Sequence, residues 1–123
     1  MIRGKVNSDR EAVIKFPIFA VDGRAEEVVA LIDTGFTDYL LLPLRFVENL
    51  GLPFESVEEL TLADGSVVEL ECYRAKVDWD GQILDVIVAV AEGDPLVGMS
   101  MSDGFEIRIR NVIGGDVEIE RIP

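Results

Sequence analysis

Four Asp-Gly dipeptides divide this chain, and three of them stand between segments of strand-like apolar pattern. These three lie at positions 22–23, 64–65 and 80–81. Asp-Gly is a strong hairpin signal, because both residues accept the positive φ angles of a tight two-residue turn. The sequence therefore predicts antiparallel hairpins and a fold that is mostly β.

The segment after the second of these turns changes its apolar phase. Val68, Leu70 and Cys72 alternate in one phase, whereas Tyr73 and Ala75 begin the other. A slip of one residue would turn half of these side chains to the wrong face of a strand, so we expect a bulge or sharp bend near Cys72. The strands expected around the three turns are residues 12–21 with 26–32, 59–63 with 67–74, and 75–79 with 83–90.

One short α-helix is expected, at residues 44–51. This segment follows Pro43, places apolar residues at helical spacing and ends on Gly51, a residue suited to a helix C-cap. The proline also ends a strand expected at residues 39–42. A shorter helical turn is expected at residues 100–104.

The two ends of the chain differ in pattern. Residues 105–109 alternate apolar and charged side chains, residues 117–122 do so less regularly, and a glycine-rich turn separates the two segments. Residues 1–10 lack that alternation. No linker, low-complexity segment or repeat interrupts the chain, so we expect a single domain over residues 1–123.

Charge and composition limit the partners. The formal net charge is −13, from 24 acidic against 11 basic residues. Nucleic acid is therefore disfavoured, because phosphate binding needs a basic face, and so are acidic substrates. No apolar stretch is long enough to cross a membrane, and residues 1–5 lack the apolar core of a signal peptide. We expect partners that are neither membranes nor nucleic acids.

The cysteine and histidine counts restrict the chemistry. Cys72 is the only cysteine, so no intrachain disulfide can form, which is typical of the reducing cytoplasm. We expect its thiol to be buried as a small apolar group. Because the chain has no histidine, a Ser-His or Cys-His mechanism and a histidine-ligated metal are excluded. No loop has the acidic spacing of a calcium site, and we expect neither a metal nor a cofactor.

One triplet carries the main chemical signal. Residues 28–32 are five apolar residues typical of a buried strand, and Asp33-Thr34-Gly35 follows directly. A carboxylate so close to a buried strand is costly unless it is paired or used. The triplet occurs once, so chemistry that needs two such carboxylates must take the second from another copy of the chain.

Three motifs occur in a fixed order along the chain. They are the run that ends in Asp33-Thr34-Gly35, the hairpin at residues 61–68, and Leu96-Val97-Gly98 before the short helical turn. With these motifs the chain resembles the retropepsin-like aspartic proteases, the single-domain relatives of pepsin. The resemblance spans about residues 12–109 and is closer to cellular and bacterial members than to viral ones. It implies a mostly β, single-domain acid-protease barrel with one short α-helix, acting as a symmetric homodimer.

The resemblance also implies a role for each residue of these motifs. Asp33 of each subunit would act as a paired acid and base on a water molecule. Thr34 would hydrogen-bond across the dimer, and Gly35 would allow close approach of the backbone. The other implied residues are Phe36, Thr37 and Asp38 on the floor of the substrate cleft, Ala63, Asp64, Gly65 and Ser66 at the tip of a closing hairpin, and Leu96, Val97 and Gly98 beneath the Asp33 loop.

The chemistry of such a pair follows from electrostatics. Two carboxyls about 3 Å apart cannot both ionise, so they share one proton. The ionised member takes a proton from water, and the protonated member hydrogen-bonds the carbonyl oxygen of the peptide. A symmetric dimer places Asp33 opposite its own copy at a two-fold axis. The expected function is an aspartic endopeptidase that binds an extended peptide by strand addition.

The chain departs from the viral pattern at three positions. Asp64 makes the hairpin tip acidic, Met99 stands where an arginine commonly pairs with an aspartate beyond the triplet, and Phe36 is bulkier than the residue usual there. The acidic, glycine-poor hairpin and the bulky Phe36 support a second hypothesis, a peptide-binding or assembly module that kept the fold and lost turnover. A separate alternative for Asp33 is a turn residue that caps the following loop through an Asx-turn.

Overall fold

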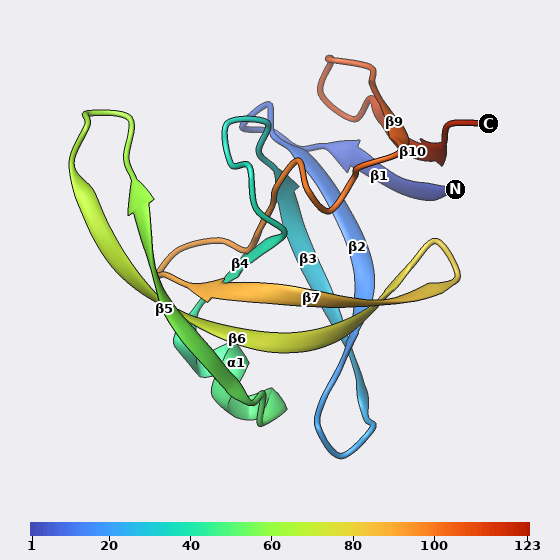
Figure 1. The fold of residues 1–123 in the computed structure, drawn as a ribbon. Helices are drawn as coiled ribbons and strands as arrows, with labels where there is room; N and C mark the ends of the chain where they lie inside the picture. The colour runs from blue at the N-terminus through green and yellow to red at the C-terminus, as the bar shows by residue number, and fades with distance from the viewer.

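The computed structural model describes residues 1–123, and Figure 1 shows a molecule built from strands with one helix. The expectation of a mostly β fold with one short helix is confirmed. In chain order the elements are β1 (Ile2–Val6), β2 (Ala12–Phe19), β3 (Ala25–Ile32), β4 (Leu40–Leu42), α1 (Leu44–Leu50), β5 (Phe54–Thr61), β6 (Val67–Trp79), β7 (Gln82–Val90), β8 (Leu96–Val97), β9 (Phe105–Ile109) and β10 (Asp116–Arg121).

All ten strands belong to one sheet, in the order β5-β6-β7-β4-β8-β3-β2-β1-β10-β9. β2 also pairs with β6, so the strands from β6 through β4 and β8 to β2 form a closed ring of pairings. Most neighbours are antiparallel, but β3 runs parallel to β8 and β4 runs parallel to β7. This topology brings the end of β3, where Asp33 follows, beside β8.

The three Asp-Gly hairpins are present as β2–β3, β5–β6 and β6–β7. The turn at Asp80 and Gly81 has positive φ at both residues, 53° and 84°, and the pair Trp79 and Gln82 closes it. The expected two-residue hairpin turn is therefore confirmed there. The first strand of the second hairpin, β5, begins at Phe54, five residues before residue 59, where the sequence predicted its start.

A bulge lies near Cys72 as expected, although it belongs to the strand opposite Cys72 rather than to the strand that contains it. β6 is one continuous strand, which Figure 1 shows as a long curved ribbon, and the register shift lies in the facing strand, between Phe54 and Ser56. β5 pairs with the first part of β6, whereas β7 pairs with the second part. Each half of β6 therefore has different neighbours, so Cys72 and Ala75 are both buried although they stand in opposite phase.

The N-terminal segment is a strand, which corrects the sequence interpretation of residues 1–10. β1 pairs with β2 on one side and β10 on the other. Ile2 and Val6 are buried, and Gly4 occupies the position between them in the same phase. A Cβ on Gly4 would lie 1.8 Å from the carbonyl oxygen of Val13, so only glycine lets β1 approach β2 so closely. The missing side chain removes the alternation that would have predicted the strand.

The core centres on Trp79, whose side chain is fully buried. Its ring meets Phe16 and Phe105 edge-on, at centroid distances of 5.3 Å and 6.2 Å, a geometry that aromatic pairs favour. Other fully buried side chains come from most of the strands and from α1. They include Ile14, Ile18, Val28, Leu40, Leu42, Leu50, Val77, Val86 and Val88.

The helix matches its expected position. Val47 and Leu50 are its buried residues, and Gly51 ends it with a left-handed φ of 65° and an N–H that donates to the carbonyl of Glu48. The helical turn expected at residues 100–104 is instead a series of turns, in which Met101 N–H donates to the carbonyl of Gly98. No helix has both the length and the apolar composition needed to cross a membrane.

Candidate functional site

Asp33 lies at the end of β3, where the backbone of β8 holds it. Its N–H donates to the carbonyl of Val97 at 2.9 Å, and its carbonyl accepts the N–H of Phe36 at 3.2 Å. Leu31 and Ile32 pair in parallel register with Leu96 and Val97, so the chain enters the loop from a fixed point. The residue itself is half-buried.

The two carboxylate oxygens of Asp33 have different surroundings. Oδ1 accepts the N–H of Gly35 at 2.9 Å, which is the Asx-turn geometry considered from the sequence. Oδ2 has no hydrogen-bond partner within the chain. One oxygen therefore fixes the orientation of the carboxyl group, and the other is free to contact a water molecule or a second carboxyl group. The turn role and a chemical role are compatible.

Asp33 and Thr34 line a hollow of about 550 Å³ on the surface of the chain. Thr34 and Gly35 are exposed, and no side-chain hydrogen bond holds the Thr34 hydroxyl. Around this hollow lie Val6, Arg10, Glu11, Ala12, Ile109 and Asn111.

Gly98 lies where two chain segments cross beneath the loop. A Cβ at this position would lie 2.0 Å from the carbonyl oxygen of Asp38 and 2.8 Å from that of Phe36. The N–H of Gly98 donates to the carbonyl of Tyr39 at 3.0 Å, and Met99 N–H donates to Phe36 at 2.8 Å. Leu96 and Val97 precede the crossing as β8 and pair with both β3 and β4. The loop after Asp33 is thus tied to the segment that follows β8.

We expect Gly98→Ala to lower the free energy of unfolding by about 2–3 kcal/mol, because the new methyl group overlaps backbone atoms that cannot rotate away. Urea unfolding followed by circular dichroism measures the change. Ser100→Ala is a suitable comparison, since it removes only a hydroxyl that donates to the carbonyl of Thr37. A Gly98→Ala protein as stable as the parent would contradict the close approach of the two segments at Gly98.

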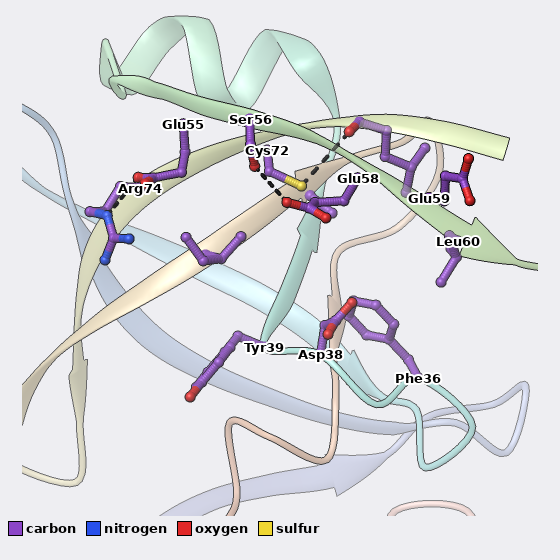
Figure 2. A pocket seen from close by; sticks show the side chains of 13 residues that line it. Phe36, Asp38, Tyr39, Glu55, Ser56, Glu58, Glu59, Leu60, Cys72 and Arg74 are labelled. Atoms are coloured by element: carbon purple, nitrogen blue, oxygen red, sulfur yellow. Dashed lines mark hydrogen bonds and ion pairs between the residues drawn. The ribbon is translucent and has the colours of Figure 1, made fainter.

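A second hollow lies on the other side of the loop and is named here the β5 groove. It encloses about 560 Å³ between β5 and residues 36–39 (Figure 2). Phe36 and Asp38 line it, as the sequence interpretation placed them in a substrate cleft, whereas Thr37 faces a different hollow beside Met99 and Ser100. The remaining groove residues are Tyr39, Glu55, Ser56, Glu58, Glu59, Leu60, Leu70, Cys72, Arg74, Ile87 and Ala89.

Sequence reasoning missed most of the β5 groove. Glu58 and Glu59 did not stand out in the sequence; both are exposed, yet they also line this hollow. The available signal was the alternation of Ser56, Glu58 and Leu60 along one strand, which places them on one face. Cys72 is buried as expected, at 3% exposure, at the inner side of the groove.

The tip of the β5–β6 hairpin is exposed and contains Ala63, Asp64, Gly65 and Ser66. Oδ1 of Asp64 accepts both the N–H of Ser66, at 2.9 Å, and its hydroxyl, at 2.6 Å. These two bonds stabilise the charged carboxylate and lower the pKa of Asp64, the hydroxyl having the larger effect. The turn is therefore fixed by its own side chains.

We expect Ser66→Ala to raise the pKa of Asp64 toward its ordinary value, since the larger of the two stabilising bonds is lost. Ser66→Thr keeps a hydroxyl and should keep the lowered pKa. Because the folded-state pKa is lowered, the bonds stabilise the turn above that pKa and are lost as the pH falls through it. NMR titration of the Asp64 carboxyl carbon measures this pKa in the parent and in both variants. The same pKa in the parent and in Ser66→Ala would show that the Ser66 hydroxyl does not lower it.

The structure thus separates the predicted site residues into neighbouring groups. Asp33 and Thr34 share one hollow, Phe36 and Asp38 share the β5 groove, and the hairpin tip stands apart from both. The carboxylate of Asp38 forms no ion pair. Asp33 is the only aspartate that lines its hollow. Glu11 is the one other carboxylate there.

Comparison with solved structures finds a similar fold in a retropepsin-like aspartic protease from Rickettsia conorii, known from a crystal structure. The two structures superpose with a TM-score of 0.59, and the match covers 98% of this chain and 90% of that one at 17% sequence identity. No protein-family model and no curated protein matches the sequence. The chain therefore has a retropepsin-like fold.

Proposed function

We propose that this chain is an aspartic endopeptidase whose catalytic pair consists of two Asp33 carboxyl groups, one from each subunit of a homodimer. One observation carries the proposal. In a retropepsin-like fold, Asp33 follows β3 with Oδ1 held by the N–H of Gly35 and Oδ2 free. That arrangement orients a carboxyl group and leaves its reactive oxygen accessible, which general acid–base catalysis requires.

In the proposed mechanism, the two Asp33 carboxyls share one proton. The ionised member accepts a proton from the attacking water, and the protonated member donates a hydrogen bond to the carbonyl oxygen of the scissile peptide bond. The Asp33 carboxyl that took the proton from water then donates it to the amide nitrogen, and the tetrahedral intermediate loses the amine. The pair needs no metal or cofactor. The exposed hydroxyl of Thr34 is available to hydrogen-bond its partner subunit and hold both loops in register.

The face beside Asp33 supports the proposed dimer. Ile109, Val112 and Ile113 are 42%, 63% and 59% exposed, and Ile109 lines the same hollow as Asp33. We name these three residues the apolar patch. Figure 1 shows the β3–β4 loop, the β9–β10 turn and the tip of the β5–β6 hairpin toward one side of the molecule, at the top of the view. A partner on that side would cover the patch and meet Asp33.

The proposal is tested by incubating the protein with a peptide mixture between pH 3 and pH 7 and reading cleavage by mass spectrometry. We expect cleavage at defined bonds, inhibited by a pepstatin-type compound and insensitive to chelators. Absence of products at every pH, at protein concentrations where sedimentation shows a dimer, would reject the endopeptidase. We also propose a cytoplasmic location, because a chain with a single cysteine cannot form an intrachain disulfide, which is typical of a reducing compartment.

A specific observation favours the second candidate, a peptide-binding or assembly module without turnover. The hairpin tip is fixed by the bonds from Ser66 to Asp64 and carries one glycine, so it is less suited to closing over a substrate than a glycine-rich tip. This candidate predicts that a peptide binds and is recovered intact after long incubation. Products at a defined bond would exclude it.

A further inference from the structure

The β5 groove combines an apolar floor with uncompensated negative charge. Its floor and sides include Phe36, Leu60, Leu70, Ile87 and Ala89. Its charged members are four carboxylates and a single guanidinium. Figure 2 shows them on two walls, with Asp38 beside Phe36 and Tyr39 on one wall and Glu55, Glu58 and Glu59 on the other, together with Arg74.

Only one of these carboxylates is neutralised by a cation. Arg74 Nε contacts Glu55 at 2.7 Å, and this ion pair occupies one end of the groove. Glu58 accepts a hydrogen bond from Ser56 at 2.9 Å, which orients it and leaves its charge in place. Asp38, Glu58 and Glu59 form no ion pair, so the rest of the groove carries three negative charges.

Charges from the two walls act on the same interior point. The pKa of the buried Cys72 thiol is raised first by burial and then by the negative charges of Glu58 and Asp38. These two carboxylates come from strand β5 and from the loop after Asp33, so their fields meet inside the groove. A field that disfavours a thiolate there favours a cation.

The aromatic residues on the loop wall favour the same ligand. Phe36 and Tyr39 flank Asp38 along this wall, and a cation above an aromatic ring is attracted to its face (Figure 2). The carboxylates are not gathered as metal ligands, since no group of three or more acidic or sulfur side chains is arranged to hold an ion. A groove with an apolar floor instead suits a cation on a long apolar stem, which lysine and arginine provide.

We propose that the β5 groove binds a lysine or arginine side chain of an extended peptide, and so makes the chain selective for basic substrates. The aliphatic stem of that side chain packs on Phe36 and Ile87, and its charged end lies between Asp38 and Glu58. The inference rests on the proposed function for its peptide ligand. Its determinants are residues other than Asp33, so binding and cleavage can be measured separately.

The test uses Asp33→Asn protein, so that cleavage does not obscure binding. Fluorescein-labelled octapeptides of alanine, valine and leucine carry lysine, glutamine or glutamate at one position, which is moved along the peptide. At one position, we expect fluorescence anisotropy to give an affinity at least tenfold higher for the lysine peptide than for the glutamine peptide. The glutamate peptide should bind more weakly than the glutamine peptide. The preference should weaken as salt screens the charges.

Variants locate the preference. Adding Glu58→Gln should reduce the ratio between lysine and glutamine peptides about threefold to tenfold, and Glu58→Lys should reverse the preference toward glutamate. Glu92→Gln removes the same charge from an exposed residue outside the groove and should leave the ratio unchanged. Circular dichroism confirms that each variant is folded.

Equal affinity for the three peptides, no binding of any of them, or equal effects of Glu58→Gln and Glu92→Gln would overturn this inference. Failure of the endopeptidase proposal is a different result, in which parent protein cleaves nothing although the lysine preference in binding persists. Cleavage without any preference for basic residues would retain the endopeptidase and reject the groove assignment.

Discussion

Asp33→Asn is expected to lower the rate of peptide cleavage by about 10²- to 10⁴-fold, the range that a general acid–base group contributes. Asparagine cannot accept the proton of water in place of the carboxylate, and both members of the pair are changed at once in a homodimer. The substitution is well matched to the structure. An asparagine Oδ1 can still accept the N–H of Gly35, so the loop keeps its Asx-turn.

Single-turnover assays at a fixed dimer concentration measure this loss, with Asp94→Asn as the matched control. Asp94 is exposed and its side chain forms no hydrogen bond, so removal of its charge should leave the rate unchanged. If Asp33 were only a turn residue, Asp33→Asn would cleave as fast as the parent. Equal rates would therefore remove the catalytic assignment of Asp33 and show that other groups carry out the cleavage.

The second large effect concerns the apolar patch. Val112→Asp combined with Ile113→Asp is expected to raise the Kd of the dimer by at least about 100-fold, because each substitution places an unpaired charge in an interface that excludes water. Cleavage activity per chain should fall with it, since a single chain contributes only one Asp33. Sedimentation velocity and activity over a dilution series measure the two quantities together.

Ile83→Asp provides the control for this effect. Ile83 is 56% exposed, close to the 59% of Ile113, but it lies at the β6–β7 turn, away from the hollow that contains Asp33. The same charge there should change neither the Kd nor the activity. A double variant that remains dimeric and active would show that the subunits associate through another face, and would leave the Asp33 assignment to be decided by the asparagine substitution.

The turn and strand signals predicted much of the fold, because they are local. Asp80 and Gly81 need only their own φ angles to form a hairpin, and Gly51 needs only its own to end the helix. β1 was not predictable by the same reasoning. The evidence for that strand is the close approach of Gly4 to Val13 on the neighbouring strand β2, a contact that requires the absence of a side chain and so leaves no apolar residue in the pattern.

The site divides in the same way. Asp33, Phe36 and Asp38 follow one strand, so a single motif located all three. Glu58 belongs to a different hairpin and reaches the groove only because β5 lies across from the loop after Asp33. The register shift in β5 adds to the difficulty, since it changes which side chains face inward on either side of Glu55. Such placement depends on how strands pair, which alternation within one strand does not encode.

The pairing of β1 with β10 has a consequence for assembly. Both end segments are already hydrogen-bonded to neighbours in their own chain, and Lys5 forms an ion pair with Asp116 between them. A newly made polypeptide can therefore complete its architecture before it meets another. In the proposed homodimer, association would then be the docking of two folded chains, and the protein concentration, rather than the folding of either copy, would determine when the paired site exists.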